Sequence, residues 1–155
     1  MRLKIRMPTL NKEQFVLDSS FLIALIDRED VHHPRAKEIF FDIEGQEGQI
    51  FLSDVLINEV LSVLARRSEE RKKGEEFKEL ARLFQKRIQE LPIVCLYELL
   101  PKYIPQVISL MVQHNGCFNF HDALFIFFLR QLPKVHFVTF DKDFSKIGNI
   151  RRLPV

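Results

Sequence analysis

The apolar pattern of the chain predicts an α/β fold, a three-layer α/β/α sandwich with a central parallel β-sheet. Short apolar runs rich in β-branched residues alternate with longer amphipathic segments along the chain. This alternation is typical of parallel strands joined by helical crossovers. The length of 155 residues suits one domain with a sizeable core. We therefore expect a single α/β domain.

Five apolar runs are predicted to be strands, and six longer segments are predicted to be helices. The strands are expected near Phe15–Asp18, Ile50–Ser53, Ile93–Leu96, His136–Phe140 and, more weakly marked, Ile150–Leu153. The helices are expected at Ser20–Ile26, His33–Ile43, Asp54–Arg67, Glu75–Glu90, Pro101–His114 and His121–Gln131. One or two helices thus separate successive strands, as in crossovers between parallel strands.

Glycine and proline residues mark the ends of several of these segments. Gly48 precedes the second strand, Pro92 precedes the third, and Gly116 follows the fifth helix. The basic stretch of residues 1–14 precedes the first predicted strand, and we interpret it either as an extra strand or as a loose arm. Residues 15–155 are interpreted as the single domain.

The composition of the chain says more about the cellular setting of the protein than about any reaction that it catalyses. The net charge of +2 is too small to indicate nucleic-acid binding by itself. Cys95 and Cys117 show no CxxC spacing, and no signal peptide is recognised, which favours a reduced, cytoplasmic setting. The longest apolar stretch, Ala123–Leu129, is far shorter than the roughly 20 residues of a membrane-spanning helix. Fifteen phenylalanines indicate either a dense core or a partner surface.

Four acidic residues stand at the ends of predicted strands or on predicted helices. Asp18 closes the run FVLD, and Asp141 follows the strand in HFVTFDKDF. Glu59 lies within one helix, and Asp122 opens another. The carboxyl ends of parallel strands share one edge of a sheet, where ligands bind. We therefore expect the four carboxylates to converge at that edge.

Converging carboxylates predict a divalent metal site. Like charges raise one another's pKa, and a bound divalent cation is the usual remedy. Oxygen ligands favour Mg²⁺ or Mn²⁺. Two such ions would balance four negative charges and suit phosphodiester cleavage, because one activates water and the other stabilises the leaving oxygen. A single ion per site is the open alternative.

Asp18 and Glu59 also have structural interpretations. Asp18 precedes two serines, so it fits a polar strand end whose serines cap the next helix. Glu59 lies at the margin of its helix's apolar arc, where it could pair with Arg66. Position alone does not decide between these interpretations and metal binding.

Asp122 and Asp141 have equally plain alternatives. Asn119 fits a helix N-cap with Asp122 three residues further on, where a negative side chain favours the helix amino end. Asp141 and Asp143 share a turn, and aspartate readily bonds its own backbone after a strand. We favour Asp141, which is nearer to the strand end, as the ligand.

Other catalytic chemistries find less support in the sequence. The five histidines show no HExxH or paired Cys/His pattern, which argues against zinc hydrolysis. The chain contains neither GxSxG nor GxxxxGK[ST]. Asp141 and Asp143 form a DxD, but a phosphatase of the haloacid-dehalogenase-like pattern would place it on the first strand. Carboxylate chemistry is what remains.

Four segments, taken in order, resemble the PIN-domain family. They are FVLDSSFLIAL, the helix with Glu59 ahead of Arg66, FHDAL and VTFDKDF. The likeness spans about Phe15 to Phe144, and within the family it is greatest to the small VapC toxins of VapBC toxin–antitoxin pairs. It implies an α/β/α sandwich that cleaves RNA at a Mg²⁺ or Mn²⁺ site.

The resemblance also implies residue roles and partners. By match of motif, the four acids inherit the catalytic metal-ligand role, and Asp143 matches an acidic position that assists as a further ligand. Ser19 and Thr139 match small polar positions that support ligands or substrate. The family also implies a homodimer and a small antitoxin whose segment blocks the acidic site. Two departures are the longer stretch before Phe15 and basic residues that do not form an obvious groove.

The competing interpretation is a catalytically inactive PIN-like module that binds RNA or serves as a scaffold. All four acids are present. A scaffold has no evident need for four repelling carboxylates at one edge of a sheet. We therefore expect a Mg²⁺- or Mn²⁺-dependent ribonuclease, with toxin activity as the more particular expectation.

Overall fold

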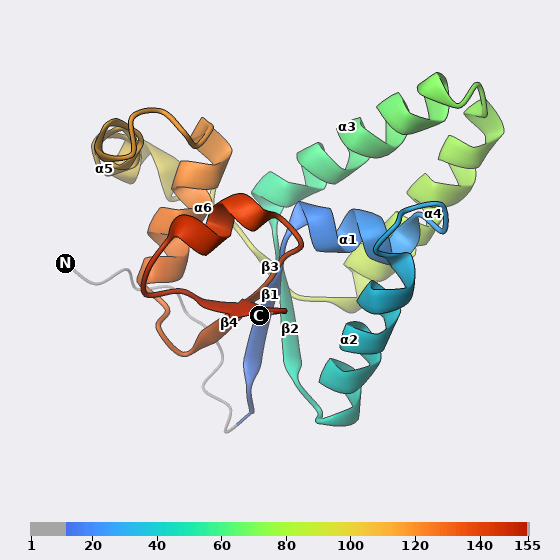
Figure 1. Ribbon diagram of the computed structural model, residues 1–155, viewed down its shortest axis with the longest axis horizontal. Coiled ribbons are helices and arrows are strands. Elements are labelled where there is room, and N and C mark those ends of the chain that lie inside the picture. Colours follow the sequence, from blue (N-terminus) through green and yellow to red (C-terminus); the bar gives the residue numbers. More distant parts are fainter. Residues whose placement is uncertain (1–11, 155) are drawn as a thin grey trace.

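The computed structural model describes residues 12–154 and contains one sheet of five parallel strands (Figure 1). The strand order is β3-β2-β1-β4-β5. The strands are β1 (Gln14–Leu17), β2 (Gln49–Ser53), β3 (Ile93–Val94), β4 (Val135–Val138) and β5 (Arg151–Leu153). All neighbouring pairs are parallel, as the alternation of apolar runs and helices predicts. Of the basic stretch, residues 1–11 lie outside the described residues.

Six α-helices and one short 3₁₀ helix connect the strands within the described part of the chain. They are α1 (Ser19–Ile26), α2 (His33–Gly45), α3 (Asp54–Glu70), α4 (Gly74–Glu90), α5 (Leu100–Gln113), α6 (Phe120–Arg130) and the 3₁₀ helix η1 (Lys142–Lys146). The predicted elements are all found with small differences at their ends, and η1 is an addition. The fourth strand ends earlier than predicted because the Phe140 N–H leaves the ladder and donates to Ser20 Oγ at 3.0 Å.

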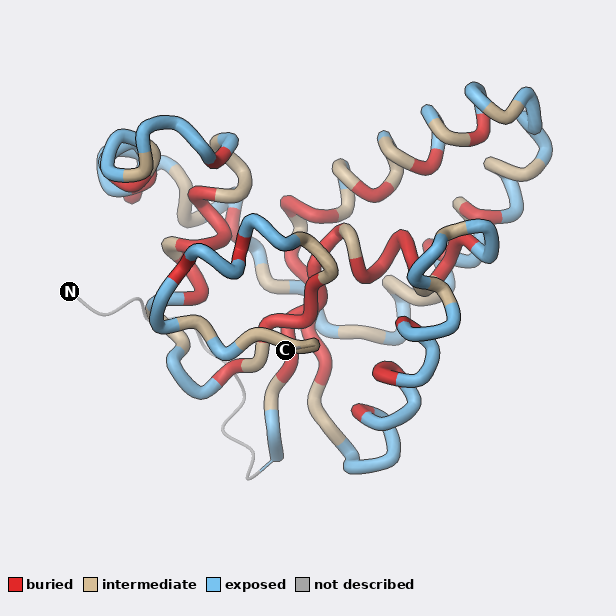
Figure 2. The backbone as a smooth tube through the Cα atoms, viewed as in Figure 1, coloured by how far each residue is buried: buried red, intermediate tan, exposed pale blue. Residues whose placement is uncertain are grey.

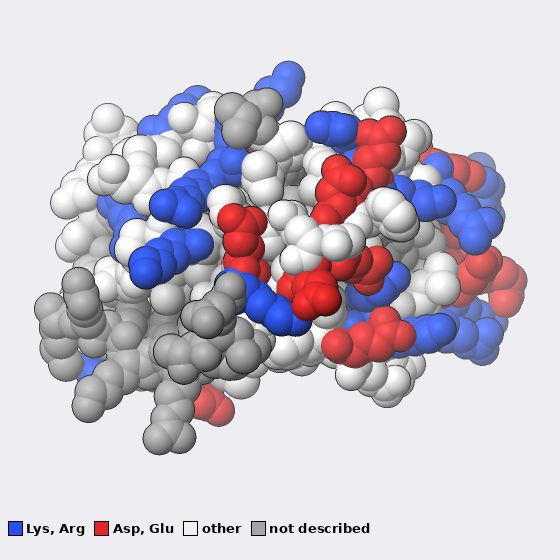
Figure 3. Space-filling model, turned by 90° about the horizontal axis from the view of Figure 1, so that it is seen from below, with Lys and Arg blue, Asp and Glu red and all other residues white. Residues whose placement is uncertain are grey.

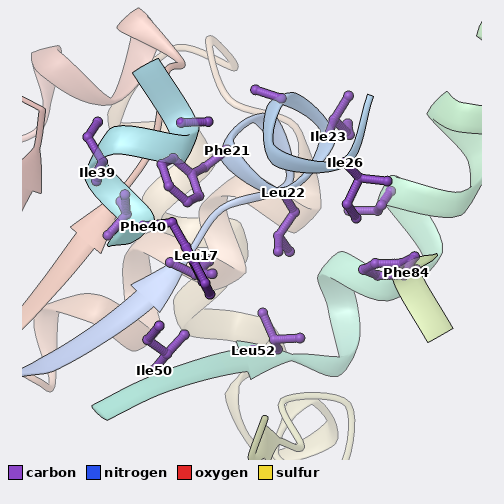
Figure 4. Close-up of a cluster of buried hydrophobic side chains, with 14 of the residues drawn as sticks. Leu17, Phe21, Leu22, Ile23, Ile26, Ile39, Phe40, Ile50, Leu52 and Phe84 are labelled. Carbon is purple, nitrogen blue, oxygen red and sulfur yellow. The ribbon is translucent and has the colours of Figure 1, made fainter. Parts of the chain in front are cut away.

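Alternating side chains divide the core into two clusters, one on each face of the sheet. Phe15 and Leu17 of β1 pack into one cluster, whereas Val16 of β1 and Phe51 of β2 pack into the other. Helices α1 to α4 contribute to the first cluster, shown in Figure 4, and α5, α6 and the first turn of α3 contribute to the second. The three central strands, β2, β1 and β4, are buried along most of their length (Figure 2), as expected for a parallel sheet covered on both faces. The predicted three-layer sandwich is confirmed.

The phenylalanine content mainly fills this core. Ten of the fifteen phenylalanines are buried. Phe41, on α2, is the largely exposed exception, with 74% of its surface accessible. No helix among residues 12–154 is long and apolar enough to cross a membrane.

The strand order places a ligand-binding position beside β1. The chain proceeds from β1 outward to β2 and β3, and then returns to the other side of β1 with β4. Open α/β sheets bind ligands outside the carboxyl ends of the strands where the order reverses, because the flanking connections part there. In this fold that position lies beyond the ends of β1 and β4. The opposite face, at the amino ends of the strands, carries both basic and acidic side chains (Figure 3).

Candidate functional site

A pocket of about 370 Å³ includes the residues that follow β1 and β4. Its lining includes all four acids that the sequence singles out, Asp18, Glu59, Asp122 and Asp141. They come from the end of β1, the middle of α3, the first turn of α6 and the start of η1. The predicted convergence of the four residues at one edge of the sheet is therefore what the structure shows.

Asp18 is the most enclosed of these acids, with 5% of its surface exposed. Its Oδ2 accepts hydrogen bonds from Ser20 Oγ at 2.6 Å and from Thr139 Oγ1 at 2.7 Å. Burial raises the pKa of Asp18, and the negative charge of Glu59 adds to this, although the two hydroxyl donors act in the opposite direction. Ser20 thus supports Asp18 through its side chain. The expectation that the serines cap α1 is wrong, because the N-cap residue is Asp18, and its side chain makes no cap hydrogen bond.

Asp122 combines a helix cap with a place in the pocket. Its N–H donates to Asn119 Oδ1 at 2.9 Å, and its Oδ2 accepts from the Asn119 N–H at 3.3 Å, which completes a capping box. Burial, together with the charges of Glu59, Asp18 and Asp141, raises the pKa of Asp122 to about 6. The interpretation of Asp122 as part of a helix cap is thus confirmed, and the charges of the other three carboxylates also act on its side chain.

Glu59 lies on the pocket side of α3 rather than in a surface ion pair with Arg66. Arg66 Nε is instead 3.9 Å from Glu70 Oε1, and both side chains are largely exposed. Glu59 lines the pocket and contributes to the raised pKa of Asp18 and of Asp122. Its half-buried position at the margin of the core follows from the apolar residues beside it on the helix.

Asp141 and Asp143 occupy different settings although they share a turn. Asp141 Oδ1 accepts from the Asp143 N–H at 2.8 Å and caps η1, while its residue also lines the pocket. Asp143 is exposed, and its Oδ1 is 2.7 Å from Lys146 Nζ, outside the pocket lining. Ligand roles for all five acids remain predictions. The position of Asp143 requires a rearrangement before it could assist.

Several pocket residues escaped sequence reasoning. Arg67 is the only lysine or arginine among the described residues that line the pocket, and His32 and Phe140 line it as well. His32 precedes the second predicted helix, and Phe140 ends the fourth predicted strand within VTFDKDF, but no local pattern joined either ring to the pocket. Arg67 follows Glu59 by eight residues on the same helix, and that spacing was a usable signal.

Arg67 is held by two aspartates at the carboxyl end of α1. Its Nη1 donates to Asp27 Oδ2 at 2.9 Å and to Asp30 Oδ2 at 2.7 Å. Arg71, the residue that caps the carboxyl end of α3, donates to both Asp27 oxygens. Asp27 is 1% exposed; its burial opposes ionisation, but the hydrogen bonds from Arg71 and Arg67 outweigh this and lower its pKa. This network ties α3 to the loop after α1.

The donor chemistry of the pocket fits a hard divalent cation. Four carboxylates line it, and two of them, Asp18 and Asp122, have raised pKa values because ionisation is unfavourable there. A cation would relieve that cost. In the present side-chain arrangement, no three His, Cys, Asp or Glu residues among residues 12–154 stand close enough together to hold a metal ion. The pocket therefore has suitable ligands without a preformed coordination shell.

A larger hollow, of about 620 Å³, lies against α1, α2 and α4. It is lined by apolar side chains such as Phe41 and Leu83, by basic residues such as Lys37 and Arg87, and by two glutamates. It holds none of the clustered aspartates. The smaller pocket is the candidate site because of its chemistry rather than its size.

The fold and the pocket define a class of α/β proteins with an acidic cluster at the carboxyl edge of a parallel sheet. Residues 15–150 match the PIN domain family, and the chain belongs to that family. Comparison with curated protein sequences found no significant match.

Solved structures of VapC toxins and VapBC complexes share this fold. VapC20 of Mycobacterium tuberculosis, a toxin that cleaves the sarcin–ricin loop, superposes with a TM-score of 0.66 and 21% identity, covering 86% of this chain and 95% of its own. VapBC2 of Rickettsia felis, bound to promoter DNA, superposes with a TM-score of 0.63 and 16% identity, covering 90% of this chain and 96% of its own. DNA-bound VapBC of Salmonella typhimurium superposes with a TM-score of 0.63 and 15% identity, again covering 90% of this chain and 96% of its own. At these identities the likeness concerns the fold.

Proposed function

We propose that this PIN domain is a metal-dependent endoribonuclease that cleaves RNA phosphodiesters at the acidic pocket. The observation that carries the proposal is the gathering of Asp18, Glu59, Asp122 and Asp141 in one pocket, where burial and the charges of the other three raise the pKa of Asp122 to about 6. Such a cluster is costly to the fold unless it binds cations. Membership of the PIN family and the shared fold of an RNA-cleaving toxin support the choice of RNA as substrate.

The residues of the pocket divide the work in a simple way. The four carboxylates would hold Mg²⁺ or Mn²⁺, with Asp18 oriented by Ser20 and Thr139. The bound ion supplies charge neutralisation at the phosphate and activates water. Asp143 is a candidate further ligand because it follows Asp141 in the same turn. Arg67 lines the same pocket, and its guanidinium would donate to a phosphate in addition to its bonds to Asp27 and Asp30.

Cleavage of a labelled RNA panel tests the proposal. Purified wild-type protein is incubated with Mg²⁺, Mn²⁺ or chelator, beside Asp122→Asn and the matched control Asp42→Asn, whose aspartate is exposed on α2. We expect metal-dependent cleavage by the wild type and the control, and a loss of at least about 100-fold in Asp122→Asn, the scale of removing one essential catalytic group. Equal cleavage by all three proteins, or cleavage in chelator, would reject the assignment.

The same experiment decides between the nuclease and the inactive module. RNA binding without cleavage under any metal condition would favour an RNA-binding module. Calorimetry adds an independent measurement, since Mg²⁺ or Mn²⁺ should bind the wild type more tightly than Asp122→Asn. No cleavage together with no metal binding would reduce the acids to cap and turn roles.

We further propose a toxin role with a small antitoxin partner, and a homodimer as the working assembly. The shared fold with VapBC complexes supports the antitoxin, and the exposed apolar side chains outside the core leave surface for protein contacts. Induced expression of the wild type should arrest cell growth, and Asp122→Asn should not. Growth arrest by both proteins would show that the toxicity does not depend on the acidic pocket.

A further inference from the structure

We propose that the exposed ring of His32 is a stacking platform for an unpaired nucleobase of the RNA substrate. The proposal rests on the ribonuclease function above and adds a residue that positions the substrate beside the acidic pocket. It is carried by three aromatic rings, Phe21, Phe140 and His32, which stack in succession from the core to the rim of that pocket.

The geometry of the three rings is that of a continuous stack. Phe140 lies in the middle, with its ring centroid 4.6 Å from that of His32 and an angle of 12° between the planes. The Phe140 and Phe21 centroids are 5.5 Å apart, with an angle of 26° between the planes. Phe21 is fully buried, Phe140 is half-buried and His32 is exposed. The stack therefore begins in the core and ends at solvent with an aromatic ring.

The backbone on each side of the stack is held by hydrogen bonds. The His32 N–H donates to Asp30 Oδ1 at 2.9 Å, and the His32 carbonyl accepts from the Ala36 N–H at 2.8 Å, at the start of α2. The Phe140 N–H donates to Ser20 Oγ, the same hydroxyl that donates to Asp18. The outer ring and the buried carboxylate thus belong to one connected framework, which reduces the ordering cost of binding.

The surroundings of the ring match one nucleotide unit of RNA. His32, Phe140 and the four carboxylates line the same pocket, and Arg67 lines it as well. Asp30 links the His32 backbone to Arg67, because its Oδ1 accepts from the His32 N–H and its Oδ2 from Arg67 Nη1 at 2.7 Å. A base on the ring would leave its phosphate in the pocket with the carboxylates that would hold the metal and with Arg67. Proteins read unpaired RNA bases by such aromatic stacking.

A stacked base must be unpaired, so the platform selects single-stranded or looped RNA over duplex RNA. Stacking is sequence-tolerant because every base has a π-face. The ring would therefore set the register of the strand in the pocket and leave base identity to other contacts. It would act mainly on substrate binding, because the stack is the same in the ground state and the transition state.

The test measures the binding of single-stranded RNA by fluorescence anisotropy in the Asp122→Asn background. The RNA is an oligonucleotide cleaved by the wild type, and a set of variants carries an abasic residue at one position each. His32→Ala should weaken binding by about 5- to 150-fold, the range for loss of one base–aromatic stack. His32→Phe keeps a ring and should bind within about threefold of His32. His114→Ala, a histidine outside the pocket, should bind as the parent protein does.

The abasic series separates stacking from a structural role of His32. At one position of the RNA, removing the base should weaken binding to the parent and leave His32→Ala unaffected, so that the two losses are not additive. A loss in His32→Ala that is the same for every abasic RNA, or parent-like binding by His32→Ala, would overturn the proposal. Thermal melts of His32→Ala and His32→Phe check that both variants fold.

Cleavage kinetics of proteins that retain Asp122, with and without His32→Ala, distinguish this proposal from the proposed function. We expect His32→Ala to raise KM with little change in kcat. Metal-dependent cleavage with an unchanged KM in His32→Ala would reject the platform and keep the nuclease. Absence of metal-dependent cleavage by the wild type would reject the nuclease itself.

Discussion

Single carboxylates in this site serve the fold and the pocket at once. Asp122 completes the capping box at the start of α6, and Asp141 caps η1, yet both line the pocket with Asp18 and Glu59. The cap and turn bonds hold the backbone of each residue at the rim of the core. A carboxylate that is fixed in this way reaches the pocket with little loss of side-chain freedom when it binds a ligand.

Asp122→Asn is expected to stabilise the metal-free protein at neutral pH. Burial and neighbouring charges raise the pKa of Asp122 to about 6 from 3.8, so between these values the folded state holds a proton that the unfolded state releases. Its contribution to the free energy of unfolding therefore falls as pH rises through this window. Partial exposure limits the cost at pH 7 to about 1 kcal/mol. Denaturant unfolding with chelator, at several pH values, measures the effect.

Asp122→Ala is the matched control for this prediction. Asparagine retains an oxygen that accepts from the Asn119 N–H, whereas alanine loses that part of the capping box. We expect the alanine variant to be about 1 kcal/mol less stable than the asparagine variant at any pH. A pH dependence that is identical in wild type and Asp122→Asn would contradict the assigned pKa.

At the scale of elements, a buried ion network joins α1 to α3 and α4. Asp27 follows α1 and accepts from Arg67 and Arg71 of the α3 end, while Arg71 also lies 3.5 Å from Glu76 of α4. Asp27 and Arg71 are 44 residues apart in the chain. The network therefore ties the carboxyl end of α3 to the residue after α1 and to α4.

Arg71→Met is expected to destabilise the protein by about 3 kcal/mol, because it leaves the buried Asp27 charge with fewer partners. The pKa of Asp27 is lowered by its arginine partners, so this stabilisation is present above the ordinary aspartate pKa and is lost as pH falls through the lowered value. The difference between wild type and variant should therefore shrink in acid. Chemical unfolding at neutral and acidic pH provides the measurement.

Arg66→Met is the control for the network. Arg66 and Glu70 form an exposed pair, so its loss should cost less than about 1 kcal/mol. Equal destabilisation by the two substitutions would show that burial of Asp27 does not control the energetics of this region.

At the scale of the whole molecule, the parallel sheet separates the catalytic edge from the other surfaces. The pocket lies beyond β1 and β4, while α5 is on the far face of the sheet from α1 and α2. Ile104, Ile108 and Val112 lie four residues apart on α5 and are 39%, 49% and 69% exposed. Residues at this spacing form one stripe on a helix.

The proposed homodimer is expected to use this stripe. Ile108→Lys places a charge in the middle of an apolar contact and should convert a dimer to a monomer in light scattering. Phe41→Lys, at an exposed apolar residue of α2, is the control and should leave the measured mass unchanged. A monomeric wild type would reject the homodimer, and a dimer that survives Ile108→Lys would place its interface elsewhere.

Local patterns in the sequence determined the order of the elements and the identity of the four acids. Periodicity of apolar residues predicts strands and helices without reference to the rest of the chain, and strand ends predict where parallel strands present side chains. The capping box of Asn119 and Asp122 was equally readable, because its two residues are three apart.

Tertiary structure alone decided the contacts between distant segments. Arg67 donates to Asp27 and Asp30, and His32 stacks on Phe140. The family resemblance gave Thr139 a supporting position, but only the folded chain shows that it donates to Asp18, 121 residues away. These contacts depend on strand order, on helix position and on side-chain direction, which no local pattern specifies. For the same reason both Asp141 and Asp143 were candidate ligands from the sequence. Only the folded chain shows that Asp141 lines the pocket, whereas Asp143 pairs with Lys146 at the surface.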